Sequence, residues 1–131
     1  FHYLPIIDEA DRVGRSSVRQ FETAYMNHPD GYVIAPHVHN AVKREVQFTK
    51  EVLFIRSGRL RVDFYDDSQN YLESRVIQGG DVILLAHGGH GFEMLEDTEI
   101  IEVKQGPYAG EEDKTRFEGI TAVQAVLKKK S

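Results

Sequence analysis

The sequence contains no cysteine, and this absence removes several kinds of chemistry. A chain without thiols has no disulfide bonds, thiolate metal sites, CxxC redox pair or cysteine nucleophile. A metal ion in this protein would therefore be held by histidine nitrogens and carboxylate oxygens. The absence also fits a reducing compartment, so we expect a cytoplasmic protein.

Long apolar runs and clusters of basic residues are missing as well. No stretch approaches the roughly 18 apolar residues that a membrane-spanning helix needs, and the first residues lack the basic start and apolar core of a signal peptide. We therefore expect no membrane partner. The formal charge is -5, with basic and acidic residues mixed along the chain, which argues against a nucleic-acid-binding surface.

The sequence has the length and the patterning of one β-rich domain. A chain of 131 residues is close to the commonest domain size. We expect a single domain over 1–131, with its core at about 18–104 and a C-terminal extension over 105–131. Short alternating segments with frequent turns predict a sandwich, jelly roll or barrel. The expected strands cover 18–26, 32–39, 45–55, 59–65, 71–77, 81–85, 92–95 and 98–104.

Two expectations concern surfaces outside the core. Helical spacing of the apolar residues between Ile120 and Leu127 predicts a short C-terminal helix over 120–129. On the strand over 59–65, apolar residues alternate with polar ones. We expect the polar set to form an exposed face with cross-strand pairs. That set consists of Arg59, Arg61, Asp63 and Tyr65.

Two histidines one residue apart are the strongest signal of chemistry. Side chains at alternate positions of a strand share a face, so His37 and His39 can hold one metal ion or line one polar pocket. The next strand carries a polar face that includes Glu45 and Glu51. This face lines a pocket or meets solvent. Two imidazoles beside a carboxylate suit Zn, Fe, Mn, Ni or Cu.

A third histidine follows a short apolar strand. His90 lies among three glycines, which allow a tight turn and a close approach of the backbone to a site. A histidine on such a turn can point inward. His87 occupies the same turn and is the alternative to His90.

The first group of these residues resembles the first motif of the cupins, small jelly rolls built as a double-stranded β-helix. That motif is a glycine, five residues, His-x-His, a short gap, a glutamate, six residues and a glycine. Eleven residues separate the second histidine from the glutamate here, where the family has three or four. The matching residues are Gly31, His37, His39, Glu51 and Gly58.

The turn around the third histidine resembles the second cupin motif. Gly80 and Gly88 match its glycines, Ala86 replaces its proline, and His90 comes one residue early. The resemblance covers about 31–104. It implies an all-β, cupin-type jelly-roll barrel.

The resemblance also implies a metal site and a class of ligand. Its metal ligands map onto His37, His39, Glu51 and His90. Glu45 competes for the role of the glutamate, and His87 for that of the last histidine. The ion would be divalent: Zn, Fe, Mn or Ni.

The function implied by the resemblance is broad. We expect a metal-binding protein that acts on or binds a small polar molecule. The first candidate for that molecule is a carbohydrate or sugar derivative. If the protein is an enzyme, isomerase or epimerase chemistry is the leading class. The alternatives are a non-catalytic small-ligand module and a metal-dependent oxygenase. A small jelly roll has sheet edges to cover, so we expect a homodimer.

Overall fold

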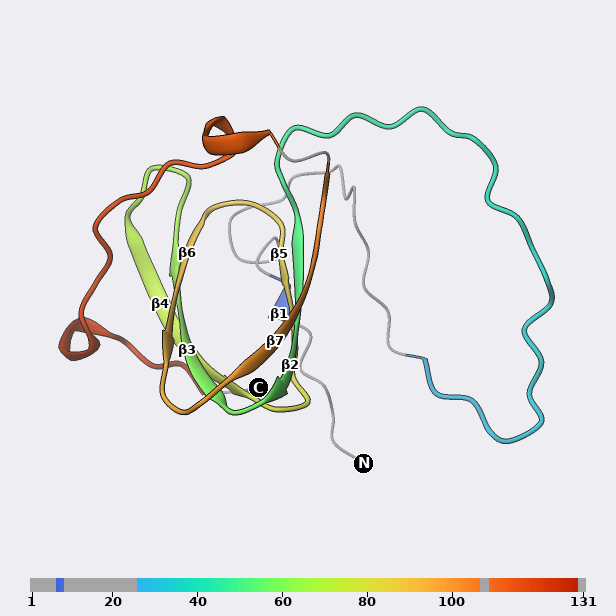
Figure 1. The fold of residues 1–131 in the computed structure, drawn as a ribbon, viewed down its shortest axis with the longest axis horizontal. Coiled ribbons are helices and arrows are strands. Elements are labelled where there is room, and N and C mark those ends of the chain that lie inside the picture. The colour runs from blue at the N-terminus through green and yellow to red at the C-terminus, as the bar shows by residue number, and fades with distance from the viewer. Residues whose placement is uncertain (1–6, 9–25, 107–108, 130–131) are drawn as a thin grey trace.

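The computed structural model describes residues 7–8, 26–106 and 109–129 (Figure 1). Within these ranges the chain forms strands and two short 3-10 helices. No helix in the described residues is long and apolar enough to cross a membrane. The elements are β1 (Ile7–Asp8), β2 (Glu51–Ser57), β3 (Arg59–Tyr65), β4 (Tyr71–Gln78), β5 (Val82–Leu85), β6 (Gly89–Met94), β7 (Glu99–Lys104), η2 (Gly110–Asp113) and η3 (Ala122–Gln124).

The strands form two facing sheets, which confirms the all-β class. One sheet has the order β1-β5-β2-β7 and the other the order β4-β3-β6. All pairs are antiparallel except β1 with β5. In the described part of the chain, β6 and β7 each pair with one strand only, so the two sheets are not closed into a barrel.

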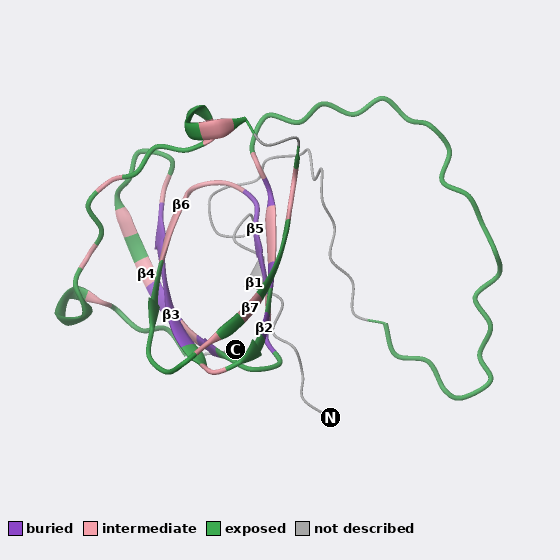
Figure 2. Cartoon of the chain, viewed as in Figure 1, coloured by how far each residue is buried: buried purple, intermediate pink, exposed green. Residues whose placement is uncertain are grey.

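The core lies between the two sheets, as the buried residues in Figure 2 show. Alternate residues of β3 point to this side because successive side chains of a strand point to opposite faces. The same alternation on the facing strands supplies the other half of the core. Its buried members are Leu53, Ile55, Leu60, Val62, Phe64, Ile77, Ile83 and Leu85.

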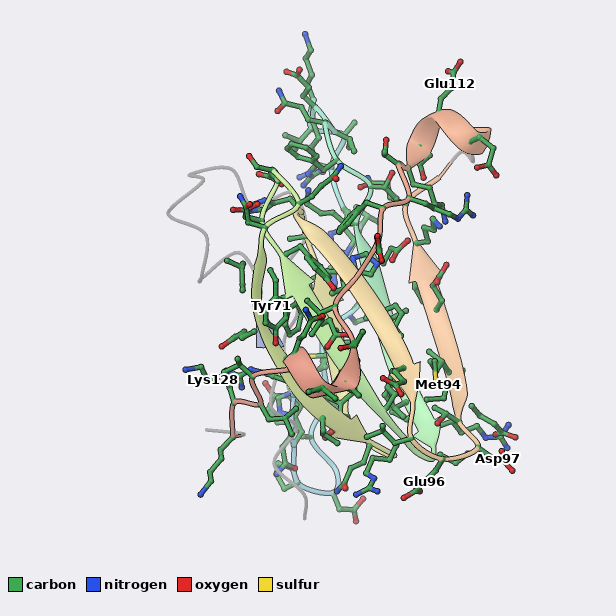
Figure 3. The ribbon with its side chains drawn as sticks, turned by 90° about the vertical axis from the view of Figure 1, so that its left-hand side faces the viewer. Tyr71, Met94, Glu96, Asp97, Glu112 and Lys128 are labelled. Atoms are coloured by element: carbon green, nitrogen blue, oxygen red, sulfur yellow. The ribbon has the colours of Figure 1, made fainter. Side chains whose placement is uncertain are left out.

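The outer face of β3 is buried as well, so the prediction of an exposed face is wrong for most of it. Arg61 is 6% exposed and Asp63 is 5% exposed, and Tyr65 is also buried. Figure 3 shows the cause: the C-terminal segment crosses the outer face of this sheet. The backbone N–H of Ile120 donates to the Tyr65 hydroxyl at 2.9 Å, which ties the segment to the strand.

The predicted C-terminal helix over 120–129 is wrong except for the single turn of η3. The segment beyond it runs beside β4, where Ser74 N–H donates to Val126 O and Lys128 N–H donates to Ser74 O, both at 2.9 Å. These bonds use backbone groups that a helix would need for itself. The helically spaced apolar residues find no core, since Val123 is 96% exposed. Tertiary hydrogen bonds have overridden the local pattern.

The Tyr71 hydroxyl is the main side-chain anchor of this segment. It accepts the N–H of Val126 at 2.8 Å and lies 2.7 Å from Ser74 Oγ. We expect Tyr71→Phe to lower the free energy of unfolding by about 1 kcal/mol, the usual net value of such bonds. Urea unfolding measures this loss, and hydrogen exchange should show faster exchange of the Val126 amide. Tyr32→Phe, at an exposed tyrosine, is the control and should change neither quantity.

Residues 26–48, here called the arm, run outside both sheets (Figure 1). The strand predicted over 32–39 is absent, and the strand predicted over 45–55 begins only at Glu51. The strand predicted over 18–26 lies outside the described residues apart from Met26, which is not in a strand.

Candidate functional site

A cavity of about 590 Å³ lies where β2 begins and β3 ends. Four separate segments form its wall: residues 48–51, 65–69, 87–91 and 113–119. The wall combines carboxylates, histidines and aromatic rings. This mixture of a few polar groups with apolar surface is typical of small-molecule sites.

Glu51 is one of the carboxylates in the cavity wall. It is the first residue of β2, and its side chain is 15% exposed. His90 Nε2 is 3.2 Å from Glu51 Oε2, and Lys104 Nζ is 3.1 Å from Glu51 Oε1. Glu51 and Lys104 are register partners across β2 and β7, which explains why they meet. A carboxylate here has a partner on each oxygen.

These partners control the ionisation of Glu51. The hydrogen bonds from His90 and from Lys104 outweigh the opposing effect of burial and lower the pKa of Glu51 from 4.5 to about 2. In turn, the hydrogen bond to Glu51 raises the pKa of Lys104. Glu51 is therefore an anion at neutral pH, available as a metal ligand or hydrogen-bond acceptor but not as a proton donor.

A second histidine–carboxylate pair borders the same cavity. His87 Nδ1 lies 3.4 Å from each carboxylate oxygen of Asp67, on the turn after β3. The ring of His87 also lies near Phe48, with 6.0 Å between the ring centroids. Both histidines of the glycine-rich turn thus reach the cavity, and His90 is the one that contacts Glu51.

Residues 113–119 form the part of the wall that the sequence did not indicate. Asp113 accepts a hydrogen bond from the Thr49 hydroxyl, and Phe117 packs edge-on against Tyr65 with ring centroids 5.0 Å apart. A Cβ on Gly89 would lie 2.9 Å from the Phe117 ring, so a larger residue here would displace that ring. A lone Phe117 within a charged stretch was the only sequence signal for this contact.

His37 and His39 lie on the arm, away from the cavity wall. Their rings are 5.3 Å apart and nearly perpendicular, and His37 Nδ1 lies 3.0 Å from the backbone oxygen of Ala35. The four predicted metal ligands therefore form two separate pairs. Across the ranges that the structure describes, no group of three His, Asp or Glu side chains is placed to hold a metal ion. Glu45, the alternative to Glu51, is also on the arm.

Comparison with known proteins does not identify a family for this chain. No protein-family model matches the chain, and neither the curated proteins nor the solved structures contain a match.

Proposed function

We propose that this protein binds a small polar molecule in the cavity beside Glu51, and that it does so as a metal-binding protein with a cupin-type jelly roll. The observation that carries the proposal is the contact between Glu51 and His90 on the cavity wall. Two residues 39 positions apart in sequence, each singled out by its motif, meet at 3.2 Å in a cavity large enough for a small ligand.

The four predicted ligands are of the right chemical type for a divalent metal. Within one described chain, however, they are not close enough together to hold one ion. Imidazole nitrogens and an ionised carboxylate are suitable ligands for Zn, Fe, Mn or Ni. Glu51 and His90 contact each other at the cavity, whereas His37 and His39 lie together on the arm. A site with all four ligands therefore requires the arm to bring His37 and His39 to a cavity that is lined by Glu51 and His90.

The cavity itself supports a polar ligand of modest size. Glu51 accepts hydrogen bonds, Lys104 beside it donates them, and Tyr65 and Phe117 provide apolar surface. Hydroxyl-rich molecules present both donors and acceptors over weakly polar faces, which makes a carbohydrate or sugar derivative the first class to screen.

Metal analysis tests the metal part of this proposal. Protein purified without a nickel column should carry close to one divalent ion per chain. The double variant His37→Ala/His39→Ala should lose that ion and remain folded, because both side chains are exposed and outside the core. His28→Ala removes a histidine of the same arm that is outside the ligand set, so it should retain the metal.

Two results would count against metal binding. One is wild-type protein that is free of metal and shows no rise in melting temperature with Mn, Fe, Ni or Zn. The other is equal loss of metal in the His28→Ala control. Binding to the folded state raises stability by mass action, so a metal that binds must raise the melting temperature.

A second candidate function is acid–base catalysis without a metal. The observation that favours it is the pair of histidine–carboxylate contacts, Glu51 with His90 and Asp67 with His87, on one cavity. Two such groups can remove and return a proton on a bound sugar, as an isomerase or epimerase requires.

Deuterium incorporation distinguishes this second candidate from simple binding. Metal-stripped protein is incubated in D₂O with sugar derivatives that NMR screening shows to bind. Uptake of deuterium at a carbon of the sugar, lost in His90→Gln, supports catalysis. Binding without uptake in the metal-stripped and metal-loaded forms indicates a binding module.

A further inference from the structure

The outer edge of β6 is open to a further strand. Among the described residues β6 pairs with β3 only. The N–H of Leu95 donates to Arg59 O at 2.9 Å. Because backbone groups alternate in direction along an antiparallel strand, those of His90, Phe92 and Met94 point away from β3. An edge with such unpaired groups is a template for another strand.

The apolar side chains at this edge belong to the core face but are only partly covered. The register places Phe92 opposite Val62 and Met94 opposite Leu60, two fully buried core residues. Phe92 is nevertheless 38% exposed and Met94 is 49% exposed. The described residues therefore leave the core only partly covered along this side, and a strand added to β6 would cover it.

The arm contains the apolar residues that a strand added to β6 would need. It forms no strand and pairs with neither described sheet, and Figure 1 shows it curving away from its own sheets. An extended segment with this much exposed apolar surface is unfavourable in water unless a partner covers it. Its exposed large apolar residues are Met26, Tyr32, Val33, Ile34, Val38, Val42, Val46 and Phe48.

We propose that two copies of this chain exchange arms, so that residues 32–39 of each copy add as a strand to the free edge of β6 in the other. Such exchange forms a two-fold dimer from contacts that each chain already encodes. The occupant is a second copy because the arm leaves its own sheets, while no described strand pairs with the edge that it would complete.

The alternation of the arm agrees with this pairing. An antiparallel register with Val33 opposite Met94 places an apolar residue of the arm over the open core. The same register brings His37 opposite His90 and His39 opposite Gly88, and both His90 and Gly88 line the cavity. The histidines of one copy would then meet Glu51 and His90 of the other. This last step rests on the metal-binding proposal, whereas the strand exchange does not.

Cross-linking between single-cysteine variants tests the exchange directly, because the chain has no other thiol. Val33→Cys on a short-tagged chain and Met94→Cys on a long-tagged chain are unfolded together, refolded and treated with a short bismaleimide. A product with the summed mass of the two tagged chains is expected. The Val33→Cys/Met94→Cys double variant should likewise cross-link between chains. A link confined to one chain would overturn the exchange and indicate that the arm folds back on its own edge.

The oligomeric state gives a second, independent readout. Light scattering should show twice the 14.9 kDa mass of one chain. Val33→Asp should shift the protein to monomer, since a charge would face the open core. Val123→Asp changes a valine that is 96% exposed and outside the arm, so it should leave the dimer intact. A wild-type monomer would refute the proposal.

Metal complementation separates the exchange from the metal proposal. His37→Ala/His39→Ala and Glu51→Gln/His90→Gln should each bind no metal alone. Refolded together, they should recover about a quarter of the wild-type metal per chain, since half of the dimers are mixed and each mixed dimer has one intact site. Cross-linking without any wild-type metal would support the exchange alone. Wild-type metal without cross-linking or complementation would support a site within one chain.

Discussion

Asp63→Ala should lower the free energy of unfolding by about 4 kcal/mol, the range measured when one partner of a buried ion pair is removed. Asp63 accepts hydrogen bonds from Arg61 Nε at 2.7 Å and Arg61 Nη2 at 3.0 Å. Ser74, which is fully buried, donates a third bond to the same carboxylate. The variant leaves a buried guanidinium with Glu93 as its remaining acidic partner, at 2.7 Å near the surface.

The loss extends beyond the ion pair because the hydrogen bonds form a directed chain. The Val126 N–H donates to the Tyr71 hydroxyl, Tyr71 donates to Ser74 Oγ, and Ser74 donates to Asp63. Without the carboxylate, the buried Ser74 hydroxyl can donate only to Tyr71, which reverses that bond and leaves the Tyr71 proton without its acceptor. We therefore expect faster hydrogen exchange of the Val126 amide in Asp63→Ala, in addition to the loss measured by urea unfolding.

A double variant tests whether the unpaired charge is the cause. Arg61→Met/Asp63→Leu removes both charges and should be more stable than Asp63→Ala, because apolar replacement of a buried pair is often neutral. It also provides a soluble comparison if Asp63→Ala does not fold. A double variant as unstable as the single one would show that shape, not charge, explains the loss.

Glu51→Gln should lower the free energy of unfolding by about 2 kcal/mol at neutral pH. The pKa of Glu51 falls from 4.5 to about 2 on folding, a difference worth about 3 kcal/mol at 1.36 kcal/mol per pH unit. Water in the cavity screens part of this interaction, so we expect the smaller figure. The glutamine keeps the shape of the side chain and loses the charge that binds His90 and Lys104.

The sign of the pH dependence follows from the lowered pKa of Glu51. The stabilisation by its carboxylate is complete above about pH 4.5, the unfolded value, and is lost as the pH falls to about 2, the folded value. The wild-type protein should therefore lose stability over this range more steeply than Glu51→Gln. Urea unfolding between pH 7 and pH 2 measures the two curves.

Glu102→Gln is the matched control for this titration. Glu102 is on β7 and lies 3.8 Å from Lys104 Nζ, but its side chain is half exposed. Exposed pairs contribute little, so this variant should differ from wild type by less than about 0.5 kcal/mol. Parallel acid curves for Glu51→Gln and wild type would show that the carboxylate is not stabilised by its neighbours.

The sequence predicted the strands whose alternation is clear and whose partners are close in the chain. The hairpin predicted over 59–65 and 71–77 is β3 with β4, and the strands predicted over 81–85 and 98–104 are β5 and β7, each within a residue or so of the observed bounds. A period of two residues defines such strands without knowledge of the rest of the fold.

The errors share a physical cause, which is that alternation identifies a polar face but not what covers it. Arg61 and Asp63 read as surface residues because the covering segment lies more than 50 residues further along the chain. The helix predicted over 120–129 failed for the same reason, because its spacing does not show that the segment bonds to Tyr71 and β4. For the site, Glu51 and His90, which come from two different motifs, are in contact. The position of the arm depends on contacts that periodicity does not encode.

The covering of β3 by residues 120–128 has a consequence for the order of folding. The hairpin of β3 and β4 closes a short loop, but the bond from Val126 to Tyr71 joins residues 55 positions apart. Distant contacts form late because closing a long loop is entropically costly. We therefore expect Arg61 and Asp63 to stay hydrated until this segment docks, so that its docking removes water from a charged pair.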